Sequence, residues 1–256
     1  MAPRVETLRP RPWVRQTDTG APTRSKDCGP RLVINGILWS SGNRVGPTTT
    51  SKARQTSWTA LVRRMMGRPG TVATSVDHWA KALKSPALRD LFAAKGLEPP
   101  NVKSLEGASW RDDVPDHLAA GRMVLAAVDY GTLADDPLDP PVGSRTFRDG
   151  HAVGFAGYTL EDGLVYTVAM DSLLMAPRVV RLRAYRDAAG DFGTHPWGRG
   201  KLEGISIARA KPIVRPQEPP EEPSSGTVTT EELMAILGPL ELAEDRLREL
   251  IDRVGG

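Results

Sequence analysis

The chain has 256 residues, of which 39% are hydrophobic and 25% charged, and its formal net charge is +3. This composition is typical of a globular protein, and so small an excess of positive charge does not indicate nucleic-acid binding. The N-terminal sequence lacks the apolar segment of a secretory signal, and no apolar stretch approaches the roughly 20 residues of a transmembrane helix. We therefore expect cytoplasmic synthesis without a signal peptide, no nucleic-acid partner and no membrane span.

The chain begins with an arm, residues 1–27, in which prolines and a glycine interrupt any periodicity. A strongly apolar run then starts at Cys28. Asp27 stands in the position of an N-cap, and Pro30 lies in the first turn, where proline is tolerated. The run predicts a helix that ends near Gly42.

Helical periodicity continues before the pattern changes to short apolar runs bounded by glycine and turn residues. The periodicity predicts a second helix over residues 56–67 and one or two helices over residues 74–96. The later runs predict strands over 122–131, 178–185 and 204–214, the last closing the sheet, and a hairpin over 151–172. Helices followed by antiparallel strands indicate an α+β domain.

The C-terminal part differs in composition from this domain. Residues 215–227 are rich in Pro and Glu and offer almost nothing apolar to bury, which predicts a linker after a domain spanning residues 28–214. Residues 228–256 return to helical periodicity and form an amphipathic tail. The tail either docks on another protein of a larger assembly or packs on its own core.

Cys28 is the only cysteine of the chain, so an internal disulfide is excluded. It is either a small buried apolar residue or a nucleophile. The start of a helix favours the thiolate, because the helix dipole and unpaired N–H groups stabilise negative charge there. One cysteine and four scattered histidines do not form a zinc-binding pattern, and we expect neither a metal nor a cofactor.

A nucleophilic cysteine needs a base, usually histidine, and a group that orients it. His78 and His117 lie in amphipathic helical segments, where structural roles are expected, and His195 lies in a predicted loop. His151 begins the predicted hairpin and Asp171 ends it. The start of one strand neighbours the end of its partner, so the spacing predicts that His151 and Asp171 meet.

Three segments, "DCGPRLVINGIL", "GHAVGFAGY" and "VYTVAMDS", resemble motifs of the papain-like cysteine peptidases, in the same order. The resemblance is closest to the bacteriocin-processing (double-glycine leader) peptidases and to related modules of bacteriophage lysins and tail proteins. It covers about residues 14–214 and implies a papain-like peptidase fold for residues 28–214. Within residues 1–27 it implies an oxyanion-side segment.

The resemblance implies that Cys28 is the nucleophile, His151 the general base and acid, and Asp171 the residue that orients the imidazole. Gln16 is the candidate amide for the oxyanion hole. It precedes Cys28 by 12 residues, about twice the usual separation in the family, so the intervening residues either loop out or the oxyanion hole is missing.

The primary hypothesis is a cysteine peptidase that hydrolyses peptide bonds, with peptidoglycan stem peptides as substrate, in a bacteriophage particle, as a tail protein, or in host lysis. Maturation of a partner protein is a second possible use of the same site, and cleavage of a host protein by an effector is a third. The alternative of a different class is a structural virion protein on a peptidase-like fold with little or no activity.

Overall fold

The computed structural model describes residues 4–15, 26–70, 72–106, 112–130, 150–173, 176–183, 185–186 and 204–213. The chain divides into two units, Met1–Lys211 and Pro212–Gly256, and the fold described here is that of the first. The described residues do not include Gln16, His195, the predicted linker 215–227 or the predicted helical tail 228–256.

The helices predicted between residues 28 and 96 are confirmed, with one shifted start. The second begins earlier than residue 56, because the Ser51 side chain accepts a capping bond from the backbone N–H of Arg54. The segment 74–96 forms two helices, and the second starts at Pro86 behind the capping residue Ser85. A short fifth helix carries His117. The helices are α1 (Cys28–Ser40), α2 (Lys52–Met65), α3 (Val76–Leu83), α4 (Pro86–Ala93) and α5 (Val114–Ala119).

The described strands form one antiparallel sheet in the order β1-β6-β2-β3-β4-β5. The last predicted strand does not close the sheet, because it lies between β1 and β2. The sequence did not indicate β1, a short edge strand with two exposed polar residues. The strands are β1 (Val102–Leu105), β2 (Met123–Asp129), β3 (Gly150–Glu161), β4 (Leu164–Asp171), β5 (Arg178–Arg181) and β6 (Gly204–Ile207).

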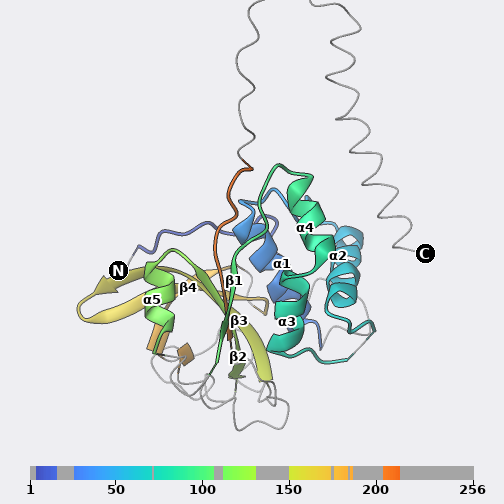
Figure 1. Ribbon diagram of the computed structural model, residues 1–256. Coiled ribbons are helices and arrows are strands. Elements are labelled where there is room, and N and C mark those ends of the chain that lie inside the picture. The colour runs from blue at the N-terminus through green and yellow to red at the C-terminus, as the bar shows by residue number, and fades with distance from the viewer. Residues whose placement is uncertain are drawn as a thin grey trace, which may run out of the picture. The chain divides into compact units, whose positions relative to one another are not determined.

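The fold is α+β, with helices on both faces of the sheet (Figure 1). Side chains of a strand alternate between faces, and β2 shows this directly. Met123 and Leu125 belong to the apolar cluster shared with α1 to α4, whereas Val124 and Val128 belong to the cluster shared with α5. Because β2 is buried on both faces, its sequence is a continuous apolar run.

The hairpin of β3 and β4 has its register set locally. Asp162 and Gly163 both have positive φ values, 52° and 74°, as the central residues of a tight two-residue hairpin turn require. A register shift between Ala156 and Thr159 surrounds Gly157, whose φ is +79°. The turn and this irregularity together determine which residues face each other at the far end of the hairpin.

The N-terminal arm is irregular over residues 4–15, as predicted, and it contacts both the sheet and a helix. Its contacts join the β3–β4 hairpin to α1. In chain order, Arg4 O accepts from Thr159 Oγ1, Thr7 Oγ1 accepts from Trp39 Nε1, Arg11 N donates to Asn43 Oδ1, and Val14 pairs through N and O with the Asn35 amide.

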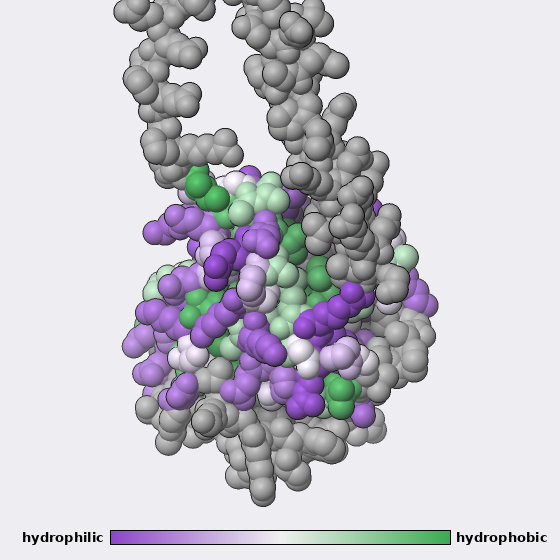
Figure 2. Space-filling view, turned by 45° about the vertical axis from the view of Figure 1, so that its right-hand side comes forward, coloured by the Kyte–Doolittle hydropathy of each residue, from purple (hydrophilic) through white to green (hydrophobic). Residues whose placement is uncertain are grey.

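Hydrophilic residues cover much of the described surface on the face in Figure 2, with hydrophobic areas scattered between them. Most large apolar side chains of the described residues are buried in the two clusters. The exposed ones are Val72, Leu160, Leu164 and Ile213.

Candidate functional site

Cys28 is the first residue of α1 and a free, partly buried thiol. All other residues of α1 are buried, so the helix is fixed on every side. Gly29 shows how tightly the start of the helix is packed, because a Cβ on this residue would lie 2.2 Å from Thr74 Oγ1 and 2.3 Å from Trp79 Nε1. Only glycine fits under this tryptophan, and the turn that carries the thiol therefore has little room to shift.

His151 and Asp171 meet at the open end of the hairpin, as the spacing predicts. Asp171 is the register partner of Val153, and His151 lies two residues before Val153 on the same face of β3. His151 Nε2 is 2.7 Å from Asp171 Oδ1, and the two side chains are 1% and 0% exposed. The carboxylate therefore fixes the orientation of the ring, and both side chains are almost completely buried.

The Asp171 carboxylate has two further hydrogen-bond donors. Oδ1 also accepts from the backbone N–H of Leu173 at 2.9 Å, and Oδ2 accepts from the Tyr130 hydroxyl at 3.0 Å. The Tyr130 ring also packs edge-on against the His151 ring, with centroids 5.0 Å apart. Tyr130 thus touches both residues of the pair. The position of Tyr130 could have indicated this role, because Tyr130 directly follows β2. In the structure, Val128 of β2 is the register partner of His151.

The electrostatics of the pair favour an imidazolium beside a carboxylate. Burial alone lowers the pKa of His151, but the Asp171 charge, the Asp171 hydrogen bond and the contacts with Cys28 outweigh it and raise that pKa. Burial alone raises the pKa of Asp171, and the attraction and hydrogen bond of His151, with the bonds from Leu173 and Tyr130, lower it. Burial and the Asp171 charge raise the pKa of Tyr130, which keeps its hydroxyl protonated as a donor.

Cys28 completes the arrangement. The thiol is hydrogen-bonded to the His151 side chain, and this bond contributes to the raised pKa of the imidazole. The structure therefore brings together three of the four residues selected from the sequence, Cys28, His151 and Asp171, and it does not describe Gln16.

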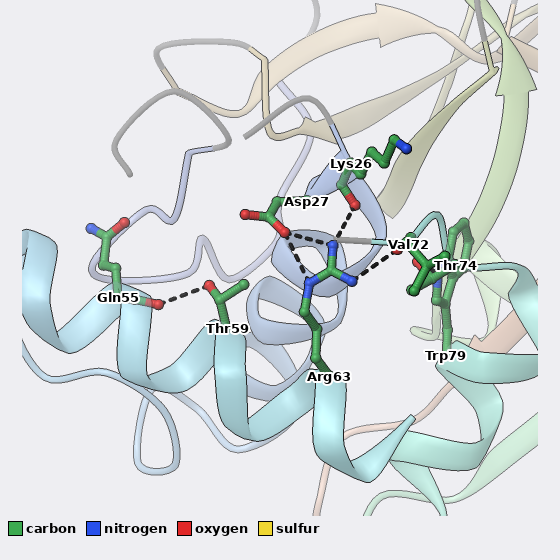
Figure 3. Close-up of polar contacts among 8 residues, drawn as sticks. All are labelled: Lys26, Asp27, Gln55, Thr59, Arg63, Val72, Thr74 and Trp79. Atoms are coloured by element: carbon green, nitrogen blue, oxygen red, sulfur yellow. Dashed lines mark hydrogen bonds and ion pairs between the residues drawn. The ribbon is translucent and has the colours of Figure 1, made fainter. Parts of the chain in front are cut away.

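Asp27 is the N-cap residue of α1, as predicted, but its carboxylate makes no side-chain capping bond. Its Oδ1 instead accepts from Arg63 Nε at 3.0 Å and Nη2 at 2.7 Å, in an ion pair with side chains 1% and 4% exposed (Figure 3). Arg31 is also buried, and its Nη1 donates to Gln55 Oε1 at 2.9 Å, a second link between α1 and α2.

The other two described histidines have structural partners. His78 Nδ1 bonds to Ser75 at the start of α3, and its Nε2 accepts from Arg68 at 2.7 Å. His117 Nδ1 lies 3.1 Å from Ser206 Oγ. Burial, followed by neighbouring cations, lowers the pKa of both.

Within the described ranges, no group of three or more His, Cys, Asp or Glu side chains is arranged to hold a metal ion. In the same part of the chain, no helix has both the length and the apolar character needed to cross a membrane.

No family model matches this chain, and no curated protein matches it significantly. The arrangement of the site is therefore the basis for a functional conclusion. A nucleophilic cysteine requires a base and a group that orients the base, and a thiol at a helix start beside an imidazole that a buried carboxylate orients meets this requirement.

Proposed function

We propose that the protein is a papain-like cysteine peptidase that hydrolyses peptide bonds at Cys28. The observation that carries the proposal is the series thiol, imidazole and buried carboxylate, in which His151 is bonded on one side to Cys28 and on the other to Asp171. The raised pKa of His151, caused mainly by Asp171, supports an imidazolium beside Cys28 that can stabilise a thiolate, the reactive form of cysteine.

Each residue has a defined step in this mechanism. The Cys28 sulfur attacks the peptide carbonyl carbon and forms a C–S bond, while the carbonyl π electrons move to the oxygen. When the C–N bond breaks, the leaving nitrogen takes the proton from His151. Water then attacks the thioester as His151 accepts its proton, and the thiolate leaves with release of the carboxylic acid. Asp171 keeps the imidazole oriented through both proton transfers.

The negative oxygen formed in each step needs hydrogen-bond donors, and we assign the Cys28 backbone N–H and the Gln16 amide to this role. The described chain that leads to Gln16 is anchored beside the nucleophile helix, because Val14 pairs with Asn35. Asn35 lies two turns from Cys28 on the same face of α1. Loss of one such donor lowers the rate by roughly 100- to 1,000-fold.

For the substrate we propose peptidoglycan stem peptides, and for the setting a bacteriophage tail or lysis component. The proposed substrate and the proposed setting both rest on the resemblance of the three motifs to lysin and tail modules. Maturation of a partner protein uses the same chemistry, and a structural virion protein would retain the fold without the reactive thiol.

The test is the rate at which iodoacetamide alkylates Cys28 near pH 7, because a chain with one cysteine reports on this thiol alone. We expect the parent to react at least about tenfold faster than His151→Ala, since removing the imidazole lowers the thiolate fraction. His117→Ala, on α5, is the matched control and should react like the parent. Equal rates in parent and His151→Ala would overturn the peptidase and leave the structural virion protein.

A second measurement identifies the substrate. Purified peptidoglycan is incubated with the parent and with Cys28→Ala, and the soluble fragments are identified by mass spectrometry. We expect new peptide termini with the parent only. A reactive thiol without new termini would reject stem peptides and favour maturation of a partner protein.

A further inference from the structure

The buried ion pair of Asp27 and Arg63 lies directly before the nucleophile. Arg63 Nη2 also donates to the Lys26 carbonyl at 2.8 Å, and Nη1 donates to the Val72 carbonyl at 2.9 Å (Figure 3). One guanidinium on α2 therefore holds the two residues that precede Cys28 and the segment that leads into α3. Arg63 has no part in the proposed proton transfers, and no sequence pattern indicated its role.

The position of Asp27 makes this pairing unusual. An aspartate before a helix normally accepts a hydrogen bond from a backbone N–H of the first turn. In α1 the third position is Pro30, which has no N–H, and the Arg31 N–H bonds to the Asp27 carbonyl at 2.9 Å. The N–H groups that a carboxylate at Asp27 could cap are therefore those of Cys28 and Gly29. The structure has no such side-chain bond.

We propose that Arg63 is a positioning residue for the nucleophile: by binding the Asp27 carboxylate, it keeps that carboxylate away from the first N–H groups of α1. The inference rests on the proposed peptidase function. The N–H groups at the positive end of the helix can then interact with the Cys28 thiolate and with the oxygen that becomes negative during catalysis. Without Arg63, a negative charge next to Cys28 would compete for the same donors and repel the thiolate.

The other contacts of Arg63 support this role. Its bond to the Val72 carbonyl fixes the segment that continues to Thr74, whose Oγ1 accepts from Trp79 Nε1 at 3.0 Å. Trp79 covers Gly29 without space for a Cβ. Arg63 therefore restrains the turn of Cys28 from the chain before it and, through residues 72–74, from the side of α3.

The experiment compares Cys28 alkylation at neutral pH in Arg63→Met, Asp27→Ala and the double variant. We expect Arg63→Met to react about tenfold more slowly than the parent, because the carboxylate is no longer neutralised. In the double variant no carboxylate remains, and it should recover most of the lost rate. Arg64→Met, an exposed arginine on the same helix, is the matched control and should equal the parent.

Recovery in the double variant is the decisive readout, since a purely structural role would leave the double variant as impaired as Arg63→Met. An Arg63→Met rate equal to that of the parent, or no recovery in the double variant, would overturn the inference. If Arg63→Met does not fold by circular dichroism, the same comparison is made between Arg63→Gln and Arg63→Gln/Asp27→Ala. Failure of the proposed function is recognised separately, by an unchanged rate in His151→Ala.

Discussion

The proposed nucleophile and its proposed base are held in place by different kinds of structure. His151 and Asp171 lie on adjacent strands of one hairpin, and a two-residue turn with one register shift determines that they meet. Cys28 begins a helix whose preceding residues are held by Arg63 and whose first turn packs against Trp79, both distant from it in the sequence. The geometry of the base is thus encoded locally, whereas the position of the nucleophile depends on long-range packing.

This difference separates the expected effects of substitutions. A change on the nucleophile side alters close packing, so it should lower the free energy of unfolding at every pH. A change at the base alters the ionisation of buried groups, so its effect should depend on pH. Three substitutions, in order of decreasing effect, test this division.

The largest effect is expected for Gly29→Ala. Alanine usually stabilises a helix relative to glycine, but this methyl group would overlap Thr74 Oγ1 and Trp79 Nε1, which are hydrogen-bonded to each other. We expect a loss of about 3 kcal/mol, or a melting temperature lower by roughly 6–12 °C, independent of pH.

Gly36→Ala is the matched control for this substitution. A Cβ at Gly36 would lie 3.2 Å from the flexible end of Ile207, so a small shift relieves the contact. We expect its melting temperature to stay close to that of the parent. Equal melting temperatures for the two alanine variants would show that Trp79 does not restrict the turn of Cys28.

The second effect is expected for Asp171→Asn, which keeps the shape of the buried pair and removes its charge. The pKa of His151, about 10 in the parent, should fall below its ordinary 6.5, because burial lowers it and the opposing charge is gone. The free energy of unfolding should decrease by about 2 kcal/mol near pH 6. Titration of the His151 ring signals by NMR measures the pKa, with the His78 signals as the internal control.

The pH dependence of the parent has a defined direction. The pKa of His151 is higher in the folded state, so its contribution to stability is complete below about pH 6.5 and is lost as the pH rises toward 10. The pKa of Asp171 is lower in the folded state, so its contribution is lost as the pH falls below about 3.8. Urea unfolding at several pH values should show the alkaline decline in the parent and not in Asp171→Asn. A flat parent profile between pH 6.5 and 10 would contradict the buried charged pair.

The same division explains how much could be predicted from the sequence. The α+β class, the first helix and the meeting of His151 with Asp171 follow from local periodicity and hairpin spacing, and they are confirmed. The N-cap position of Asp27 is also confirmed, but the partner of its side chain was not predictable, because a local rule for helix caps does not include a cation from α2. The position of β6 inside the sheet likewise depends on β1, whose sequence carries little strand signal.

The smallest effect is expected for Tyr130→Phe, which removes the hydroxyl bond to Asp171 and leaves the ring against His151. We expect a loss of about 1.5 kcal/mol in the free energy of unfolding, the usual size for a hydrogen bond to a charged group. The pKa of Asp171 should rise, since the Tyr130 bond contributes to lowering it.

Tyr158→Phe, farther along β3, is the matched control, and its free energy of unfolding should be close to that of the parent. The prediction also tests whether the His151–Asp171 pair depends on a residue outside the β3–β4 hairpin. Tyr130 belongs to neither strand of the hairpin, so if its hydroxyl stabilises Asp171, even the locally encoded pair needs one residue from a third segment. If Tyr130→Phe and Tyr158→Phe are equally stable, the hairpin alone is sufficient to hold His151 and Asp171.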